Sequence, residues 1–348
     1  MEEVWQTSTL GPELTTSSGN VTVEEEHWRV VLDIVNSAIM ACNTVTLMLG
    51  MGAAISVVDL WHHTKRPIGA VIGMVGQFLV LPAIGFCLSM GFKLRPYEAL
   101  GVLMISCSPG GSFSNFFTFW VDGDLALSIM MTVCSSLLAF GGMPFNLWLY
   151  GRYWHGDDEN SFTIPFGNIV TSLVFVSGPV VVGMAVRHYR KRAAEIITKV
   201  ASLVGWLGVI TGGVIWSILY WQVFVTATPL LYLAAILLPL VGFIFAFTLA
   251  KLACQNNKIG RTIGVETSSQ NMPVAVSIIL LSFQGTEVKG ELILFPTLYG
   301  VFLISEAVLG ILAFQLYKRF YKKDKDQPPM HTARLESATP AEKETLRV

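Results

Sequence analysis

The chain has 348 residues, of which 53% are hydrophobic and 14% charged, and its mean hydropathy is +0.58. This composition excludes an ordinary soluble globular domain and indicates an all-α integral membrane protein. The formal net charge of -1 gives no reason to expect nucleic acid as a partner. The five cysteines lie within or at the end of apolar segments, so we expect neither a disulfide framework nor a cysteine metal site.

Residues 1–29 hold six acidic residues and a run of Ser, Thr and Gly. This composition predicts a disordered tail. The sequon Asn20-Val21-Thr22 makes Asn20 a candidate glycosylation site, which requires the tail to be extracellular.

Nine apolar windows follow, each near the roughly 20 residues that a membrane-spanning helix needs. We therefore expect nine transmembrane helices within residues 30–317, followed by a cytoplasmic tail over 318–348. The windows cover residues 30–51, 68–92, 99–119, 125–150, 166–186, 196–219, 229–250, 262–283 and 291–317.

The basic residues between these windows are distributed unequally. With the N-terminus outside, about fifteen Lys and Arg fall in inner segments and about five in outer ones. Positive charge favours the cytoplasmic side. We therefore expect a multi-pass plasma-membrane protein with an extracellular N-terminus and a cytoplasmic C-terminus.

Two features recur at one spacing. Residues 79–86 (LVLPAIGF) match residues 236–243 (ILLPLVGF), 157 positions further on, and Ser114-Asn115 corresponds at nearly the same spacing to Gln270-Asn271. The second window matches the seventh, five places further on, and this odd number gives the two halves opposite orientations. This pattern predicts an inverted repeat of four plus four helices with the fifth as connector.

The eighth window is too polar to face lipid along its whole length. Glu266 at bilayer depth costs about 2.5 to 3.5 kcal/mol, so it must face protein or a wet cavity and have a partner. Gln270 lies on the same helical face. Pro273 cannot donate the helical hydrogen bond, so we expect the helix to open near residues 269–272. A kinked helix whose polar groups bind only each other is the alternative.

The third window is interrupted in a similar way. Pro109 removes a backbone donor, and Gly110 and Gly111 permit backbone angles that other residues avoid. A pair of glycines in a membrane helix can also be a simple packing site. With a matching break one repeat away, the pattern predicts two broken helices that cross near the midplane.

Such a crossing gathers oxygen ligands and one carboxylate, which is the set a hard cation prefers. No His or Cys pair shares the face, so Na⁺ suits it better than zinc or copper. Ser128 and Thr132 share one helix face and Gln77 precedes Pro82. Each hydroxyl could instead bond its own helix.

Three motifs together resemble the sodium/bile acid cotransporter family, whose members import bile acids and steroid sulfates, over about residues 30–320. The motifs are Pro109-Gly110-Gly111-x-x-Ser114-Asn115, the Val121-Asp122-Gly123-Asp124 turn followed by Leu127-Ser128 and Met131-Thr132-x-Cys134-Ser135, and Glu266-Thr267-x-x-Gln270-Asn271.

The resemblance implies a panel domain of about residues 30–51, 166–186 and 196–219 that rocks against a core domain of about residues 68–150 and 229–317. It also implies two sodium sites. One would use Ser114, Asn115, Ser128, Thr132 and Glu266; the other would use Gln77, Glu266 and Gln270 with carbonyl groups near Thr267 and Ser269. Substrate would lie near Ser112 and Asn271.

The departures from the family pattern concern the substrate. Ser112 follows the two glycines where Thr or Asn is usual, residues 272–275 read Met-Pro-Val-Ala, and Ala126 stands where Asp is common. The polar cation ligands are all retained, so the departures leave the implied sodium dependence intact and bear on the implied bile acid substrate.

The resulting interpretation is a sodium-coupled symporter that imports amphipathic organic anions by alternating access. Conjugated bile acids are the first expectation, and steroid sulfates or other organic anions are the alternative. A receptor that binds such ligands without moving them is a second class. A membrane protease, with Glu266 paired to Asp33 or Glu306, is a third, but no spacing requires those carboxylates to meet. We therefore expect no enzymatic activity.

Overall fold

The computed structural model describes residues 16–54, 68–111, 113–154, 165–283 and 288–325. Within these ranges the protein is helical, and its one β-type contact is an isolated antiparallel bridge between Gly110 and Gln270. Ser112 lies outside the described residues, as do 1–15 and 326–348 of the two predicted tails.

Seven continuous helical segments are long and apolar enough to cross a membrane. Their outward faces carry many exposed Leu, Ile, Val and Phe side chains, which fits contact with lipid. The protein is thus an all-helical, multi-pass membrane protein. The segments are α1 (Thr16–Ala54), the run of α3 (Ile68–Val75), η1 (Gly76–Val80) and α4 (Leu81–Gly91), α7 (Leu125–Gly151) with η2 (Arg152–Trp154), α8 (Phe166–Tyr189), α9 (Lys191–Leu219), α11 (Pro229–Leu252) and α14 (Lys289–Lys325).

Two further apolar windows are each divided between two short helices. The third window contains α5 (Pro96–Ser106) and α6 (Phe113–Trp120), and the eighth contains α12 (Asn257–Ser268) and α13 (Met272–Ser282). None of the four reaches the roughly 20 residues of a full span. Pro273 occupies the first turn of α13, where its missing N–H costs nothing.

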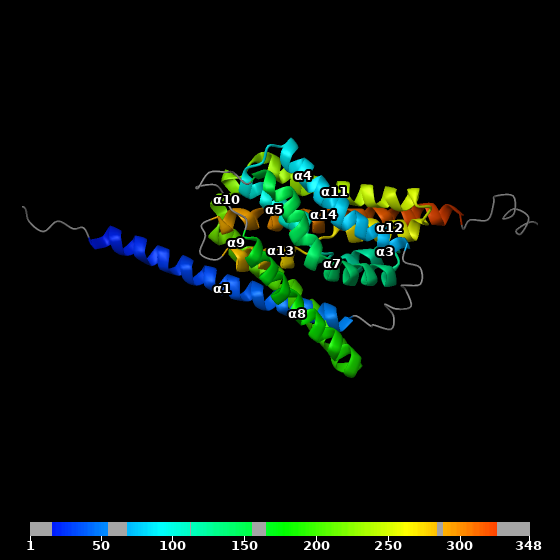
Figure 1. The fold of residues 1–348 in the computed structure, drawn as a ribbon, viewed down its shortest axis with the longest axis horizontal. Helices are drawn as coiled ribbons and strands as arrows, with labels where there is room; N and C mark the ends of the chain where they lie inside the picture. The colour runs from blue at the N-terminus through cyan, green and yellow to red at the C-terminus, as the bar shows by residue number, and fades with distance from the viewer. Residues whose placement is uncertain (1–15, 55–67, 112, 155–164, 284–287, 326–348) are drawn as a thin grey trace, which may run out of the picture.

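The helices pack into two groups that meet along α1 and α8. One group is formed by α1, α8 and α9, which contact one another closely, and α13 packs against both α1 and α8. The rest of the molecule is formed by α3 to α7 and α11 to α14, with the short helix α10 (Trp221–Thr226) linking α9 to α11. In Figure 1, α1 and α8 lie along one side of the molecule and α3, α11 and α12 on the other.

The helical ends differ from the sequence expectation. Residues 16–29 were expected to be disordered, but they form the first part of α1, and α14 continues past residue 317 to Lys325. Hydropathy marks where a helix can face lipid. It does not mark where the backbone stops being helical, because Glu and Lys are good helix formers outside the membrane. The candidate Asn20 therefore lies within α1.

Candidate functional site

The two interrupted stretches run past each other in opposite directions. Gly111 N donates to Ser269 O at 2.7 Å, and Asn271 N donates to Pro109 O at 2.9 Å. These bonds satisfy backbone groups that the broken helices leave open, which is the condition for unwound backbone at membrane depth. The α5–α6 and α12–α13 linkers therefore cross each other. We call residues 107–111 and 269–271 the crossing.

The glycines are needed because the two backbones approach so closely. A Cβ atom on Gly110 would lie 2.8 Å from Glu266 Oε1, and one on Gly111 would lie 2.9 Å from Gln270 O. Neither distance leaves space for a side chain. The two glycines thus belong to the crossing itself.

The Glu266 carboxylate faces the crossing and is completely buried. Ser128 donates its hydroxyl to Oε2 at 2.7 Å, and Thr132 donates to Oε1 at 2.5 Å. The Ser114 hydroxyl, which donates to Gly111 O at 2.7 Å, also interacts with this carboxylate. No described Lys or Arg forms an ion pair with it. A buried carboxylate with hydroxyl partners alone has donors but no compensating positive charge.

Buried amides and hydroxyls gather beside the carboxylate. Gln77 lies in the π-helical turn η1, and its amide meets that of Gln270 at 3.1 Å. Gln270 also reaches the α5–α6 linker, where its Oε1 accepts from Ser108 Oγ at 3.3 Å. Gln77 Oε1 and Thr267 Oγ1 are buried without a hydrogen-bond partner among the described residues. Oxygens of this kind are the ligands of hard cations, so the donor set fits Na⁺.

The Val121–Asp124 turn places α7 so that Ser128 and Thr132 face Glu266. Asp124 N donates to Thr262 Oγ1 at 2.7 Å, which fastens the start of α7 to α12. Asp124 Oδ1 caps α7 by accepting from Leu127 N at 3.1 Å. From α12, Arg261 Nε donates to Val121 O at 2.7 Å. The turn therefore fixes the position of α7 relative to α12.

Two residues that support the crossing were missed by the sequence analysis. The fully buried Tyr299 of α14 donates to Ser268 O, and its hydroxyl accepts from Gln270 N at 3.1 Å. Ser135 accepts from Gly110 N at 3.1 Å. Ser135 ends one of the family-like motifs but was given no role, and the only sequence signal for Tyr299 is a hydroxyl in an apolar window, which many residues share.

The predicted site residues do not all lie in one place. Ser269 contributes its carbonyl to the crossing. Asn271 caps α13, its Oδ1 accepting from Val274 N at 3.2 Å, while its buried Nδ2 has no partner among the described residues. Asn115 lies on α6 beside a separate cavity. The residues gathered around Glu266 or Gln270 are Gln77, Ser114, Ser128, Thr132 and Thr267.

That cavity lies between the α1–α9 pair and the α6–α7 pair and has a volume of about 320 Å³. Leu47, Met51 and Phe116 form apolar walls, and Asn115 and Thr132 bring polar groups to it. Since Thr132 also bonds Glu266, one wall of the cavity is shared with the carboxylate site.

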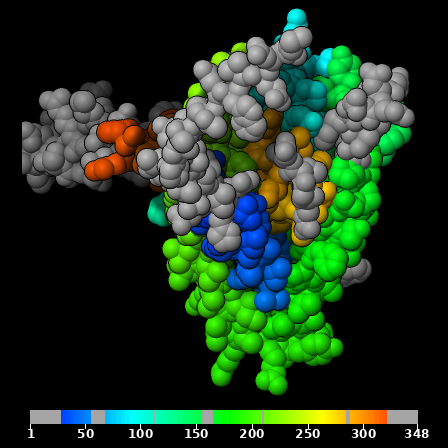
Figure 2. Space-filling model, turned by 90° about the vertical axis from the view of Figure 1, so that its left-hand side faces the viewer, coloured from blue at the N-terminus to red at the C-terminus, as the bar shows by residue number. Residues whose placement is uncertain are grey.

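The other end of α1 is tied to α14. Lys289 Nζ lies 2.6 Å from Asp33 Oδ2, and the Tyr220 hydroxyl donates to Asp33 Oδ1 at 3.0 Å. Figure 2 shows α1 in blue between the green of α8 and α9 and the orange of α13 and α14. The two groups of helices are thus joined by an ion pair at this end, and a cavity lies between α1, α9, α6 and α7 at the other.

The comparison with known proteins agrees with these features. Residues 44–228 match the model of the Sodium Bile acid symporter family. The ileal sodium/bile acid cotransporter of Homo sapiens is 35% identical over 313 residues, which cover 90% of this chain and 89% of that protein. The sodium-dependent organic anion transporter of Bos taurus is 35% identical over 318 residues, covering 90% and 83%, and that of Rattus norvegicus is 36% identical over 293 residues, covering 84% and 77%. The resemblance seen in the motifs is confirmed, and the chain belongs to the sodium bile acid symporter family.

Proposed function

We propose that the protein is a sodium-coupled symporter that imports amphipathic organic anions, conjugated bile acids first and sulfated steroids as the alternative. One observation carries the proposal. Glu266 is fully buried, accepts from Ser128 and Thr132, and has no described Lys or Arg as an ion-pair partner. A captured Na⁺ supplies the missing positive charge, and the family and its relatives carry names that state sodium coupling.

The proposed architecture has nine spans. The α5–α6 and α12–α13 pairs each complete one span in addition to the seven continuous ones, and the two broken spans belong to opposite halves of an inverted repeat. The panel domain consists of α1, α8 and α9, and the core domain contains the other spans. The close packing of α1 on α8 and α9 supports this division.

We assign the ions to two adjacent positions at the crossing. The first uses Ser114, Asn115, Ser128 and Thr132 with Glu266. The second uses Gln77, Glu266 and Gln270 with the carbonyl groups of Thr267 and Ser269. The buried and unpartnered Gln77 Oε1 and Thr267 Oγ1 support the second position, because a cation is attracted to oxygens that no donor occupies.

The anion is assigned to the cavity between panel and core, and Ser112 and Asn271 stay its predicted contacts. The apolar walls suit a rigid hydrophobic body, and the polar groups near Asn115 and Thr132 suit hydroxyl or anionic substituents. Thr132 lines this cavity and also donates to Glu266. Through Thr132, the ion and the anion can affect each other's binding.

The proposed orientation places the N-terminus outside and the C-terminus in the cytoplasm of a plasma-membrane protein, following the bias of basic residues. With an inside-negative potential of 100 mV, each positive charge that enters contributes about 2.3 kcal/mol. Sodium coupling can therefore drive accumulation of an anion that the potential alone would exclude. Alternating access follows if the panel rocks against the core about the crossing.

Uptake in cells that express the protein tests the function. Radiolabelled taurocholate and estrone sulfate are supplied in sodium medium and in a medium with N-methylglucamine in place of sodium. We expect at least one anion to accumulate only with sodium, and accumulation to require Glu266 but not Glu291, a partly exposed carboxylate on α14 that pairs with Arg95 at 4.0 Å. Binding of either anion without accumulation in sodium would contradict transport and support the receptor class.

A further inference from the structure

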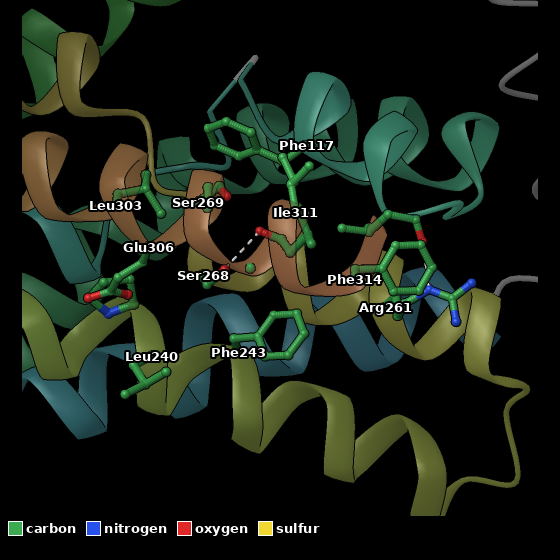
Figure 3. Close-up of a pocket in the computed structure, with 15 residues that line it drawn as sticks. Phe117, Leu240, Phe243, Arg261, Ser268, Ser269, Leu303, Glu306, Ile311 and Phe314 are labelled. Carbon is green, nitrogen blue, oxygen red and sulfur yellow. Dashed lines mark hydrogen bonds between the residues drawn. The ribbon is translucent and has the colours of Figure 1, made fainter. Parts of the chain in front are cut away.

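A second cavity lies between α11 and α14, behind the crossing. It has a volume of about 310 Å³ and is walled by α6, α11, α12 and α14, with no lining residue from α1, α8 or α9. Glu266 is not among the lining residues. We name this cavity the α11–α14 pocket; Figure 3 shows it.

The pocket lining is apolar apart from a few groups. Three aromatic rings, those of Phe117, Phe243 and Phe314, contribute to the walls. Among the described lining residues, Glu306 of α14 is the one acidic side chain and Arg261 the one basic side chain. In Figure 3, Glu306 and Arg261 lie at opposite ends of the pocket.

Glu306 has no positive partner within the described part of the chain. Its Oε1 is buried without a hydrogen bond, and no ion pair includes it. Arg261 is already engaged, because it donates to Val121 O and Asp122 O and its guanidinium lies 5.0 Å from the centre of the Phe314 ring. An intramembrane carboxylate in this condition indicates a functional site whose partner comes from elsewhere.

We propose that the α11–α14 pocket binds a lipophilic amine, an organic cation with an apolar body and one ammonium group. The ammonium pairs with Glu306, and the apolar body packs against the aromatic side chains. The faces of these rings also attract the positive charge of the ammonium. The volume is in the range of small-molecule pockets. An organic anion fits poorly, because its charge would meet the Glu306 carboxylate without a free basic group beside it.

The position of the pocket lets such a ligand enter from the lipid and touch the crossing. Leu240 and Gly310 on its rim are exposed on the lipid-facing side of α11 and α14, so an amine dissolved in lipid reaches it laterally. Ser268 and Ser269 form part of its wall, and their carbonyls bind Tyr299 and Gly111 at the crossing. A bound amine therefore contacts the back of the crossing.

Equilibrium binding of radiolabelled imipramine to the full-length protein in lipid nanodiscs tests the proposal, and it requires no transport. Iminodibenzyl, the uncharged ring system of imipramine, is the matched probe without an ammonium group. Glu306→Gln removes the charge with little change of shape. Glu291→Gln is the control on the same helix outside the pocket. Gly310→Leu adds a large side chain at the rim of the pocket, where a Cβ meets no atom within 4 Å, and so should obstruct the pocket without a clash.

We expect imipramine to bind the wild type and Glu291→Gln equally, and to bind Glu306→Gln and Gly310→Leu about tenfold or more weakly. Iminodibenzyl should bind all four poorly. The proposal is wrong if the wild type binds no imipramine, if Glu306→Gln binds it like the wild type, or if iminodibenzyl binds as tightly. Competitive displacement by taurocholate would also overturn it, by assigning the pocket to the anion path. Should Glu306→Gln not fold, the Gly310→Leu variant and the paired probes still decide.

Discussion

Lys289 Nζ of α14 lies 2.6 Å from Asp33 Oδ2 of α1, so one ion pair joins two helices whose paired residues are 256 positions apart. Tyr220 donates to the same carboxylate. Both charged side chains are mostly buried, at 15% and 28% exposure, which is why the pair is worth more than a surface salt bridge. In the proposed transporter this contact closes the outer end between panel and core.

Removing this ion pair should favour opening at the outer end. Asp33→Asn and Lys289→Gln each should increase the rate at which a cysteine placed in the cavity at Phe116 reacts with an impermeant thiol reagent added outside. Charge exchange in the double variant Asp33→Lys, Lys289→Asp should restore part of the wild-type rate, with a coupling of about 1 kcal/mol. Arg152→Gln is the control, because Arg152 forms no ion pair among the described residues. Equal labelling of all variants would show that the pair does not hold the two groups together.

Gly110 should tolerate no side chain. Gly110→Ala places a Cβ atom 2.8 Å from Glu266 Oε1 and 3.2 Å from Ser135 Oγ, and such overpacking costs about 1–3 kcal/mol. Gly141→Ala on α7 is the matched control, because its Cβ meets no atom within 4 Å. Thermal unfolding of the purified proteins in detergent should show a lower Tm for Gly110→Ala alone. A wild-type Tm for Gly110→Ala would mean that the crossing has more space than the structure shows.

Tyr299 should support the α12–α13 linker through its hydroxyl. Tyr299→Phe leaves Ser268 O and Gln270 N without their buried partner, which costs about 1–3 kcal/mol. Because Gln270 is a proposed sodium ligand, the sodium concentration for half-maximal uptake should rise more than the KM for the anion. Tyr153→Phe, at an exposed tyrosine of η2, is the control. If Tyr299→Phe lowers maximal uptake but leaves the sodium concentration for half-maximal uptake unchanged, Tyr299 has only a structural role.

Sequence patterns located the interruptions because their causes are local. Pro109, Gly110, Gly111 and Pro273 act through their own backbone chemistry, and the structure places α5, α6, α12 and α13 around them. The spacing of Ser128 and Thr132 put both hydroxyls on one helix face, and both bond Glu266.

Contacts between distant segments could not be read in the same way. Asp33 gave no sequence signal of an ion pair, but it pairs with Lys289 because α1 and α14 meet in the fold. Tyr299 and Ser135 act on linkers 29 and 25 positions away. No periodicity or motif encodes which helix faces which linker, so their roles became visible only in three dimensions.

Binding of ²²Na⁺ to the purified protein tests the central claim most directly. Wild type and Glu291→Gln should bind sodium equally. Glu266→Gln, which keeps the shape of the side chain and removes its charge, should bind at least about tenfold more weakly. Unchanged sodium binding by a folded Glu266→Gln protein would contradict the account, because the carboxylate at the crossing would then not hold the ion.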